Sequence, residues 1–114
     1  MAQSDLTAER VAENNAIFRK ANEGIQDAAR RYSIDGGVPF LCECADAGCM
    51  EILRLELDDY EAIRTAPTYF INAPGHHTAD QSWVTVVERR NGYEIVEKIG
   101  PAAGVAEALD PRND

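Results

Sequence analysis

Residues 40–50 read FLCECADAGCM, and this stretch holds all three cysteines of the 114-residue chain. Cys42 and Cys44 are separated by one residue, and Cys49 follows five positions after Cys44. Because residues i and i+2 of a strand point to the same side, Cys42 and Cys44 should project together from the end of a strand. A turn at 45–48 then brings the chain back to Cys49. The spacing predicts a loop that gathers three thiolates at one point.

A structural zinc site needs four ligands in a tetrahedron, so three cysteines leave one position to fill. The chain has two histidines, which are adjacent in the segment APGHHTA. The Pro-Gly turn before His76 can swing that side chain towards another loop, whereas His77 would point elsewhere in an extended segment. We therefore predict a closed zinc site whose ligands are Cys42, Cys44, Cys49 and His76. His77 is the alternative fourth ligand.

Other interpretations of the cysteines stay open. They could be inert core residues, a disulfide from Cys49 to Cys42 or Cys44 with one spare thiol, a catalytic thiol, or ligands of an iron–sulfur cluster. A catalytic zinc ion would need an open position, with Glu43 or Glu51 as general base. The simpler interpretation of both carboxylates is exposed charge. No H-E-x-x-H motif and no pairing of H-x-E with P-C-x-x-C is present.

The charge of the chain limits its partners and its location. The net charge is −9 and the sequence pI is about 4.6, which argues against non-specific binding to nucleic acids and anionic membranes. No apolar run has the length of a membrane span, and MAQSDLTAER lacks the features of a signal peptide. We therefore expect a cytoplasmic protein, in which a cysteine cluster is a metal or catalytic site more often than a disulfide framework.

Residues 5–32 are predicted to form one long helix, because no proline interrupts a segment rich in good helix formers. Ser4 or Asp5 can cap its start. Apolar residues recur along it every seven positions, with alanines between them: Val11, Phe18, Ala21, Ile25, Ala28 and Tyr32. This stripe can dock on the chain's own sheet, or it can pair with a second copy, where Asn14 would set the register.

The remainder of the chain predicts short strands and helices. Gly36-Gly37 is a natural hinge, so we divide the chain into an N-terminal helix and hinge, 1–37, used for docking or dimerisation, and a zinc-binding α+β domain, 38–114. Strands are predicted at 38–43, 51–57, 69–73, 83–90 and 93–99, a short middle helix at 59–66 and a short C-terminal helix at 101–109. Asp58 and Glu61 form a capping-box-like pair at the middle helix. Asn91-Gly92 predicts a hairpin, with a two-residue or a longer loop.

Three segments carry a resemblance to known proteins: FLCECADAGC, LDDYEAIRTAPTYFINAPGH and VVERRNGYEIVEKIGPAAGVAEALDPR. Together with the N-x-x-I-F-R-x-x-N pattern of the first helix, they resemble a group of small uncharacterised bacterial proteins. That group has a C-x-C-x4-C segment, a Pro-Gly-His turn and a Val-Val-Glu-Lys strand. Arg89 stands where the last pattern has lysine. The C-x-C-x4-C spacing is also similar to the zinc segment that follows SET domains, as an analogy of spacing alone.

These observations predict a fold and favour one function among several. We expect an α+β fold in which a long N-terminal helix is followed by a small antiparallel sheet with a zinc-binding loop. The expected function is a zinc-stabilised module for protein interaction or regulation, with a protein partner or self-association through residues 5–32. A zinc-dependent enzyme with an open metal position, a thiol-based redox or zinc sensor, and a transcription-linked regulator are the alternatives. No catalytic residue is assigned.

Overall fold

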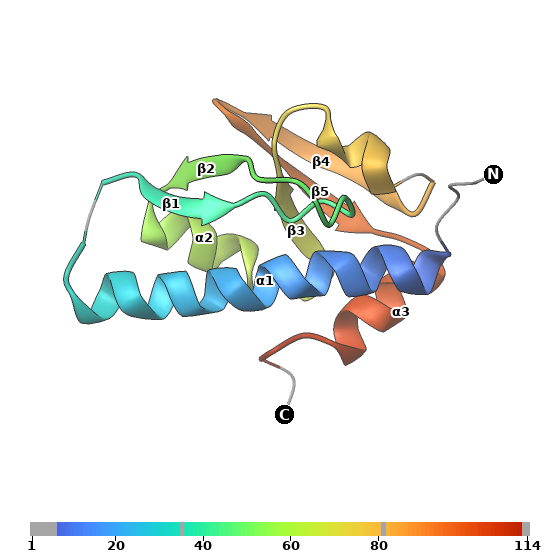
Figure 1. Ribbon diagram of the computed structural model, residues 1–114, viewed down its shortest axis with the longest axis horizontal. Helices are drawn as coiled ribbons and strands as arrows, with labels where there is room; N and C mark the ends of the chain where they lie inside the picture. Colours follow the sequence, from blue (N-terminus) through green and yellow to red (C-terminus); the bar gives the residue numbers. More distant parts are fainter. Residues whose placement is uncertain (1–6, 35, 81, 113–114) are drawn as a thin grey trace.

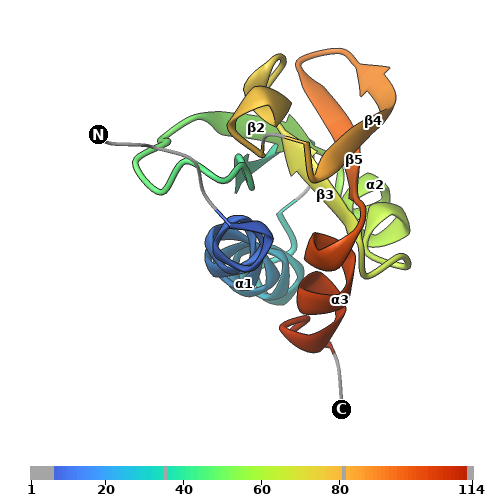
Figure 2. The ribbon, with the colours of Figure 1, turned by 90° about the vertical axis from the view of Figure 1, so that its right-hand side faces the viewer.

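The computed structural model describes residues 7–34, 36–80 and 82–112, and its fold is α+β as predicted. A long N-terminal helix lies along one side of two small antiparallel sheets (Figure 1). Seen along that helix, α1 and α3 lie side by side beneath the strands (Figure 2). The elements in chain order are α1 (Ala8–Arg31), β1 (Val38–Leu41), β2 (Ile52–Leu55), α2 (Leu57–Ile63), β3 (Tyr69–Asn72), the 3-10 helix η1 (His76–Asp80), β4 (Val84–Arg90), β5 (Tyr93–Lys98) and α3 (Pro101–Ala108).

The strands form a two-stranded sheet, β1–β2, and a three-stranded sheet in the order β3–β5–β4. In the β4–β5 hairpin Arg90 lies opposite Tyr93 and Arg89 lies opposite Glu94, which confirms the two-residue loop at Asn91-Gly92. Gly92 has a φ of 90°, a value that a tight hairpin turn requires and that glycine adopts most readily. The predicted strands are all present, and each is shorter than the range that the sequence suggested.

Helix α1 is present, but its buried face is not the one that the apolar pattern predicts. Asn15, Arg19, Asn22 and Gln26 are all buried, whereas Tyr32 is 71% exposed and Ala21 and Ala28 are also exposed. Val11 and Ile25 of the predicted stripe do face inwards. The periodicity was misleading because the helix lies against strand and loop backbone, which needs hydrogen-bonding partners rather than apolar side chains.

The ends of two helices correct predictions about caps. Helix α1 begins at Ala8 with Thr7 as its N-cap, whose hydroxyl accepts a hydrogen bond from Arg10 N–H; Ser4 and Asp5 lie outside the described residues. Helix α2 begins at Leu57 and has no side-chain cap, so the predicted capping pair is wrong. Asp58 is already inside the helix, and Glu61 instead accepts hydrogen bonds from Arg112.

The larger apolar core lies between β1, β2, α2 and the inner strands, and it reaches the cysteine loop. The Phe40 and Tyr60 rings stack with centroids 4.3 Å apart at its centre. Cys42 and Cys44 belong to this same cluster. The end of β1 is therefore anchored by apolar burial at the point where the candidate site begins. In the described part of the chain, no helix is long and apolar enough to cross a membrane.

Candidate metal centre

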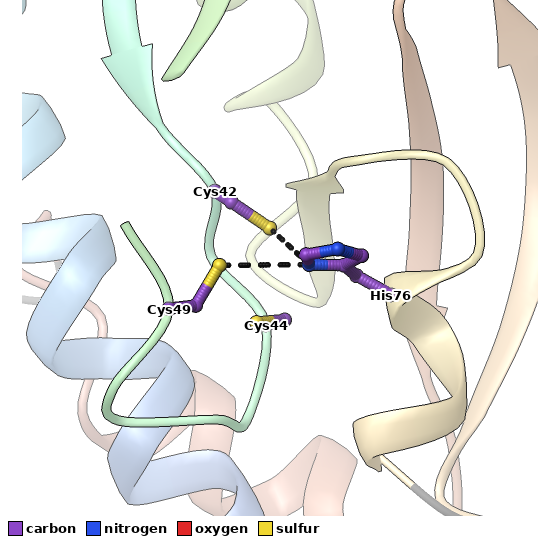
Figure 3. Close-up of side chains that lie close together, drawn as sticks. All are labelled: Cys42, Cys44, Cys49 and His76. Atoms are coloured by element: carbon purple, nitrogen blue, oxygen red, sulfur yellow. Dashed lines mark hydrogen bonds between the residues drawn. The ribbon is translucent and has the colours of Figure 1, made fainter. Parts of the chain in front are cut away.

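The structure brings the three cysteines and His76 together from two loops. Cys42 and Cys44 follow β1, and Cys49 lies shortly before β2 on the same connection. His76 begins η1, directly after the Pro-Gly turn. The three sulfur atoms and a ring nitrogen of His76 all lie within 4.8 Å of one another. Figure 3 shows the four side chains converging from either side. The two loops thus meet at a single cluster of potential ligands.

Two S···N distances within this cluster are those of a tetrahedral metal site. The Nδ1 atom of His76 lies 3.6 Å from the Cys42 sulfur and 3.5 Å from the Cys49 sulfur (Figure 3). With metal–sulfur bonds of about 2.3 Å and metal–nitrogen bonds of about 2.0 Å, the S···N edge of a tetrahedron is about 3.5 Å. His76 Nδ1 is therefore at ligand spacing from two thiols. All three cysteines are free thiols, with no disulfide between them.

The turn that returns Cys49 to the other cysteines is organised by Asp46. Its carboxylate accepts a hydrogen bond from Gly48 N–H at 2.9 Å, and its carbonyl accepts one from Cys49 N–H at 3.0 Å. An aspartate that bonds the backbone two residues ahead forms an Asx turn, a common local signal for such loops. The turn at 45–48 was predicted from the sequence, but the part that Asp46 plays in shaping it was not.

Three asparagines of α1 hold the backbone of the cysteine loop. Asn14 donates to the Ala45 carbonyl at 2.7 Å and Asn15 donates to the Glu43 carbonyl at 2.6 Å. Asn22 both donates to the Leu41 carbonyl at 2.9 Å and accepts from Leu41 N–H at 2.8 Å. These side chains hydrogen-bond to the backbone of the loop, as the backbone of a neighbouring strand would. The helix thereby holds the backbone of alternate residues 41, 43 and 45, on either side of Cys42 and Cys44.

Glu43 lies between two of the candidate ligands, and its position corrects the expectation of an exposed charge. The residue is 1% exposed. Its carboxylate accepts hydrogen bonds from Asn22 at 2.8 Å, from Ile71 N–H at 3.0 Å and from the Tyr60 hydroxyl at 3.4 Å. Burial raises the pKa of this carboxyl. Glu43 therefore joins the loop to α1, α2 and β3, whereas Glu51 is exposed as expected.

Arg19 of α1 is also part of the polar interior. Arg19 is fully buried, donates to the Pro67 carbonyl at 2.5 Å and to the Tyr69 carbonyl, and lies over the Phe70 ring. Burial lowers its pKa to about 10, so the guanidinium remains charged at neutral pH. Sequence reasoning missed this function, because arginine in a helix is usually solvent-exposed.

The thiols of the cluster influence one another's protonation. The pKa of Cys44 is lowered to about 5, chiefly by a hydrogen bond from Cys42 and further by one from His76. The pKa of Cys42 is raised by the same pairing and by burial. The Cys42 sulfur also accepts a hydrogen bond from Ala73 N–H at 3.1 Å. The cluster thus favours one thiolate, and a bound cation would favour more because thiolates are the metal ligands.

His77 points away from the cysteines. Its Nδ1 atom lies 3.0 Å from a carboxylate oxygen of Glu94, which also accepts hydrogen bonds from Gly75 N–H and Arg89. Gly75 has a φ of 84°, so the chain turns sharply just before the two histidines, which both lie in η1. The structure thus separates the two candidates, with His76 at the cysteines and His77 paired with a carboxylate.

Comparison with known proteins gives no match: no family model, no curated protein and no solved structure matches the chain. The resemblance to small bacterial proteins stays an expectation that rests on the residues quoted above. The assignment of a function therefore depends on the geometry of the cluster.

Proposed function

We propose that this chain is a small zinc-binding protein in which Cys42, Cys44, Cys49 and His76 hold one structural zinc ion. The observation that carries the proposal is the convergence of four ligand atoms within 4.8 Å, with the Cys42 and Cys49 sulfurs at the tetrahedral S···N spacing from His76. Three thiolates and one imidazole suit zinc, which prefers sulfur and nitrogen ligands in a tetrahedron. With His76 in the fourth position the site is closed, which favours a structural over a catalytic ion.

The proposed ion would join the two sheets. Its cysteine ligands lie on the connection between β1 and β2, and its histidine lies on η1, between β3 and β4. These segments come from different sheets. A metal bond between them would restrain both loops and stabilise the domain.

We further infer that the protein works through contacts with other proteins in the cytoplasm. The acidic surface disfavours nucleic acids, and free thiols suit a reducing compartment. Self-association through residues 5–32 would have to use the outer face of α1, where Ile17 is 62% exposed, because the inner face is buried within the chain.

A redox or zinc sensor is the second candidate, and one observation favours it. Cys49 is only partly buried and lines an open groove, so an oxidant could reach this thiol. Zinc release at low oxidant concentration, with recovery on reduction, would support that function.

The test is elemental analysis of the protein purified without added metal, together with its Cys42→Ser, His76→Ala and His77→Ala variants. We expect one zinc ion per chain in the wild type and in His77→Ala, and loss of zinc in the other two. Zinc retained in His76→Ala but lost in His77→Ala would make His77 the fourth ligand, whereas zinc retained in both histidine variants would indicate an open site and favour an enzyme. Absence of metal from the wild-type protein, even after zinc is added, would refute the proposal.

A further inference from the structure

Strand β2 has a free edge. Cys42 N–H donates to the Glu51 carbonyl, and the same register pairs Phe40 with Leu53. Because hydrogen-bonded pairs alternate along an antiparallel ladder, the backbone N–H and C=O groups of Ile52 and Arg54 point away from β1. Within the described residues, β2 pairs with β1 alone. These outward groups are therefore available to another strand.

The outer edges of β1 and β4 are protected. The outer edge of β1 is covered by α1, whose asparagines bond Leu41, Glu43 and Ala45. Strand β4 has a bulge between Val86 and Glu88 and ends in charged residues. Bulges, charges and covering helices are devices that prevent strand addition. Strand β2 has neither a bulge nor a covering helix, and it offers two outward-facing backbone positions.

An apolar groove adjoins the start of this edge. The groove has a volume of about 450 Å³ and lies between α1, the metal loop and β2. Met50 is 87% exposed and Ile52 is 49% exposed on its rim. The lining residues are Phe18, Leu41, Ala47, Gly48, Cys49, Met50 and Ile52. Exposed apolar side chains around a groove are typical of a binding surface.

The opposite end of the edge is acidic. A smaller pocket of about 210 Å³ is lined by Ile34, Glu56, Leu57 and Asp58. Across residues 45–59 there are five acidic residues and a single basic one, Arg54. The guanidinium of Arg54 donates to the Gly37 carbonyl at 3.2 Å. The surroundings of β2 therefore favour a positively charged partner.

We propose that the free edge of β2 binds an extended, basic segment of a partner protein as an added antiparallel strand. Its backbone would pair with Ile52 and Arg54, an apolar side chain would enter the groove beside Met50, and lysine or arginine would approach Glu56 and Asp58. This mode combines main-chain hydrogen bonds with side-chain pockets. A second copy of the chain fits less well, because pairing two edges would bring two acidic surfaces together. The inference rests on the proposed protein-binding function but not on the metal.

The test uses a fluorescein-labelled peptide of sequence KVKLKVK and measures its binding by fluorescence anisotropy. Two control peptides accompany it, one with glutamate in place of lysine and one with alternate backbone nitrogens methylated. Met50→Lys and Ile52→Lys should weaken binding by about tenfold, because they fill the groove with charge. Val87→Lys is the matched control, since Val87 is 44% exposed on the distant strand β4, and it should leave binding unchanged. Amide exchange at Ile52 and Arg54 should slow when the peptide is bound.

The outcomes separate this inference from the zinc proposal, because zinc content is measured on every variant. Equal binding of the N-methylated peptide, or unchanged exchange at Ile52 and Arg54, would overturn strand addition even if the zinc site is correct. A dimer in sedimentation analysis that Ile52→Lys dissociates would assign the edge to a second copy and also overturn the proposal. Peptide binding by wild-type protein that holds no zinc, even after zinc is added, would support strand addition and refute the metal site alone.

Discussion

Glu43 and Ile71 hydrogen-bond to each other in both directions across the two sheets. The Glu43 N–H donates to the Ile71 carbonyl at 2.8 Å, and the Ile71 N–H donates to the Glu43 carboxylate at 3.0 Å. The end of β1 is thereby joined to β3, so the strands lie in the spatial order β2–β1–β3–β5–β4. This link is made next to Cys42 and Cys44 by protein groups alone, so it restrains the loop without help from a metal.

Replacing Glu43 with alanine should lower the free energy of unfolding by about 3 kcal/mol, because it leaves buried donors of Asn22 and Ile71 without their acceptor. Urea denaturation measures the effect. Glu51→Ala, at an exposed position on the same loop, is the control and should change stability by less than about 0.5 kcal/mol. If Glu43→Ala does not fold, Glu43→Gln should, with a smaller loss, since its amide oxygen can still accept from Ile71. Equal stability of Glu43→Ala and wild type would contradict the link.

Removal of the proposed zinc ion should leave the protein folded. The asparagine contacts of α1 and the Glu43–Ile71 pair hold the loops independently of metal. Chelation should therefore preserve the helical circular dichroism signal and a cooperative thermal transition, while the melting temperature falls by about 10 °C. Loss of helical signal on chelation would mean that the metal supplies the folding free energy, as it does in classical zinc fingers.

Replacing Gly92 and Gly24 with alanine should change the free energy of unfolding in opposite directions. Gly92 has a φ of 90° with open space around it, so Gly92→Ala strains the backbone alone and should cost about 1 kcal/mol or more. Gly24 lies within α1, exposed and also without close neighbours. Gly24→Ala should raise the free energy of unfolding by about 0.5–1 kcal/mol, because alanine favours helix. Urea denaturation of both variants provides the test, and a shared sign would show that the two backbones are described wrongly.

The stability contributed by Asp110 should depend on pH. Its carboxylate accepts a hydrogen bond from the fully buried Arg64 guanidinium at 2.5 Å. Burial opposes ionisation of Asp110, but the bonds from Arg64 and from Arg112 N–H outweigh it and hold the pKa below 3.8. Because the pKa of Asp110 is lower in the folded than in the unfolded chain, its ionised carboxylate stabilises the fold at a pH above the unfolded-state pKa. This contribution is lost as the pH falls through the folded-state pKa.

Asp110→Asn should therefore be less stable than wild type by about 1–3 kcal/mol at pH 7. The difference should narrow as the pH falls below 3.8. Urea denaturation of both proteins at several pH values measures this difference, and because the other carboxylates are shared, their titration cancels. A difference that is constant between pH 7 and pH 3 would show that the charge of Asp110 contributes nothing.

Much of this protein could be predicted from local signals. Asn91-Gly92 between two β-rich segments predicted the hairpin, and Pro101 predicted the start of α3. The cysteine spacing and the Pro-Gly turn predicted which side chains converge, because each needs only a strand end and a turn to orient it. The predicted capping pair at α2 was wrong because Glu61 accepts hydrogen bonds from Arg112 instead. Arg112 lies 51 residues away, so local sequence does not reveal this contact.

The order of residues alone specifies the element types, the tight turns and the four side chains at the cluster, since these depend on backbone preferences over a few positions. Tertiary packing decided which face of α1 is buried. Asn15, Arg19 and Asn22 become interior residues only because carbonyl groups and carboxylates of distant segments meet them there. No periodicity reveals such partners, because a buried polar side chain is stabilised by specific acceptors rather than by apolar surface.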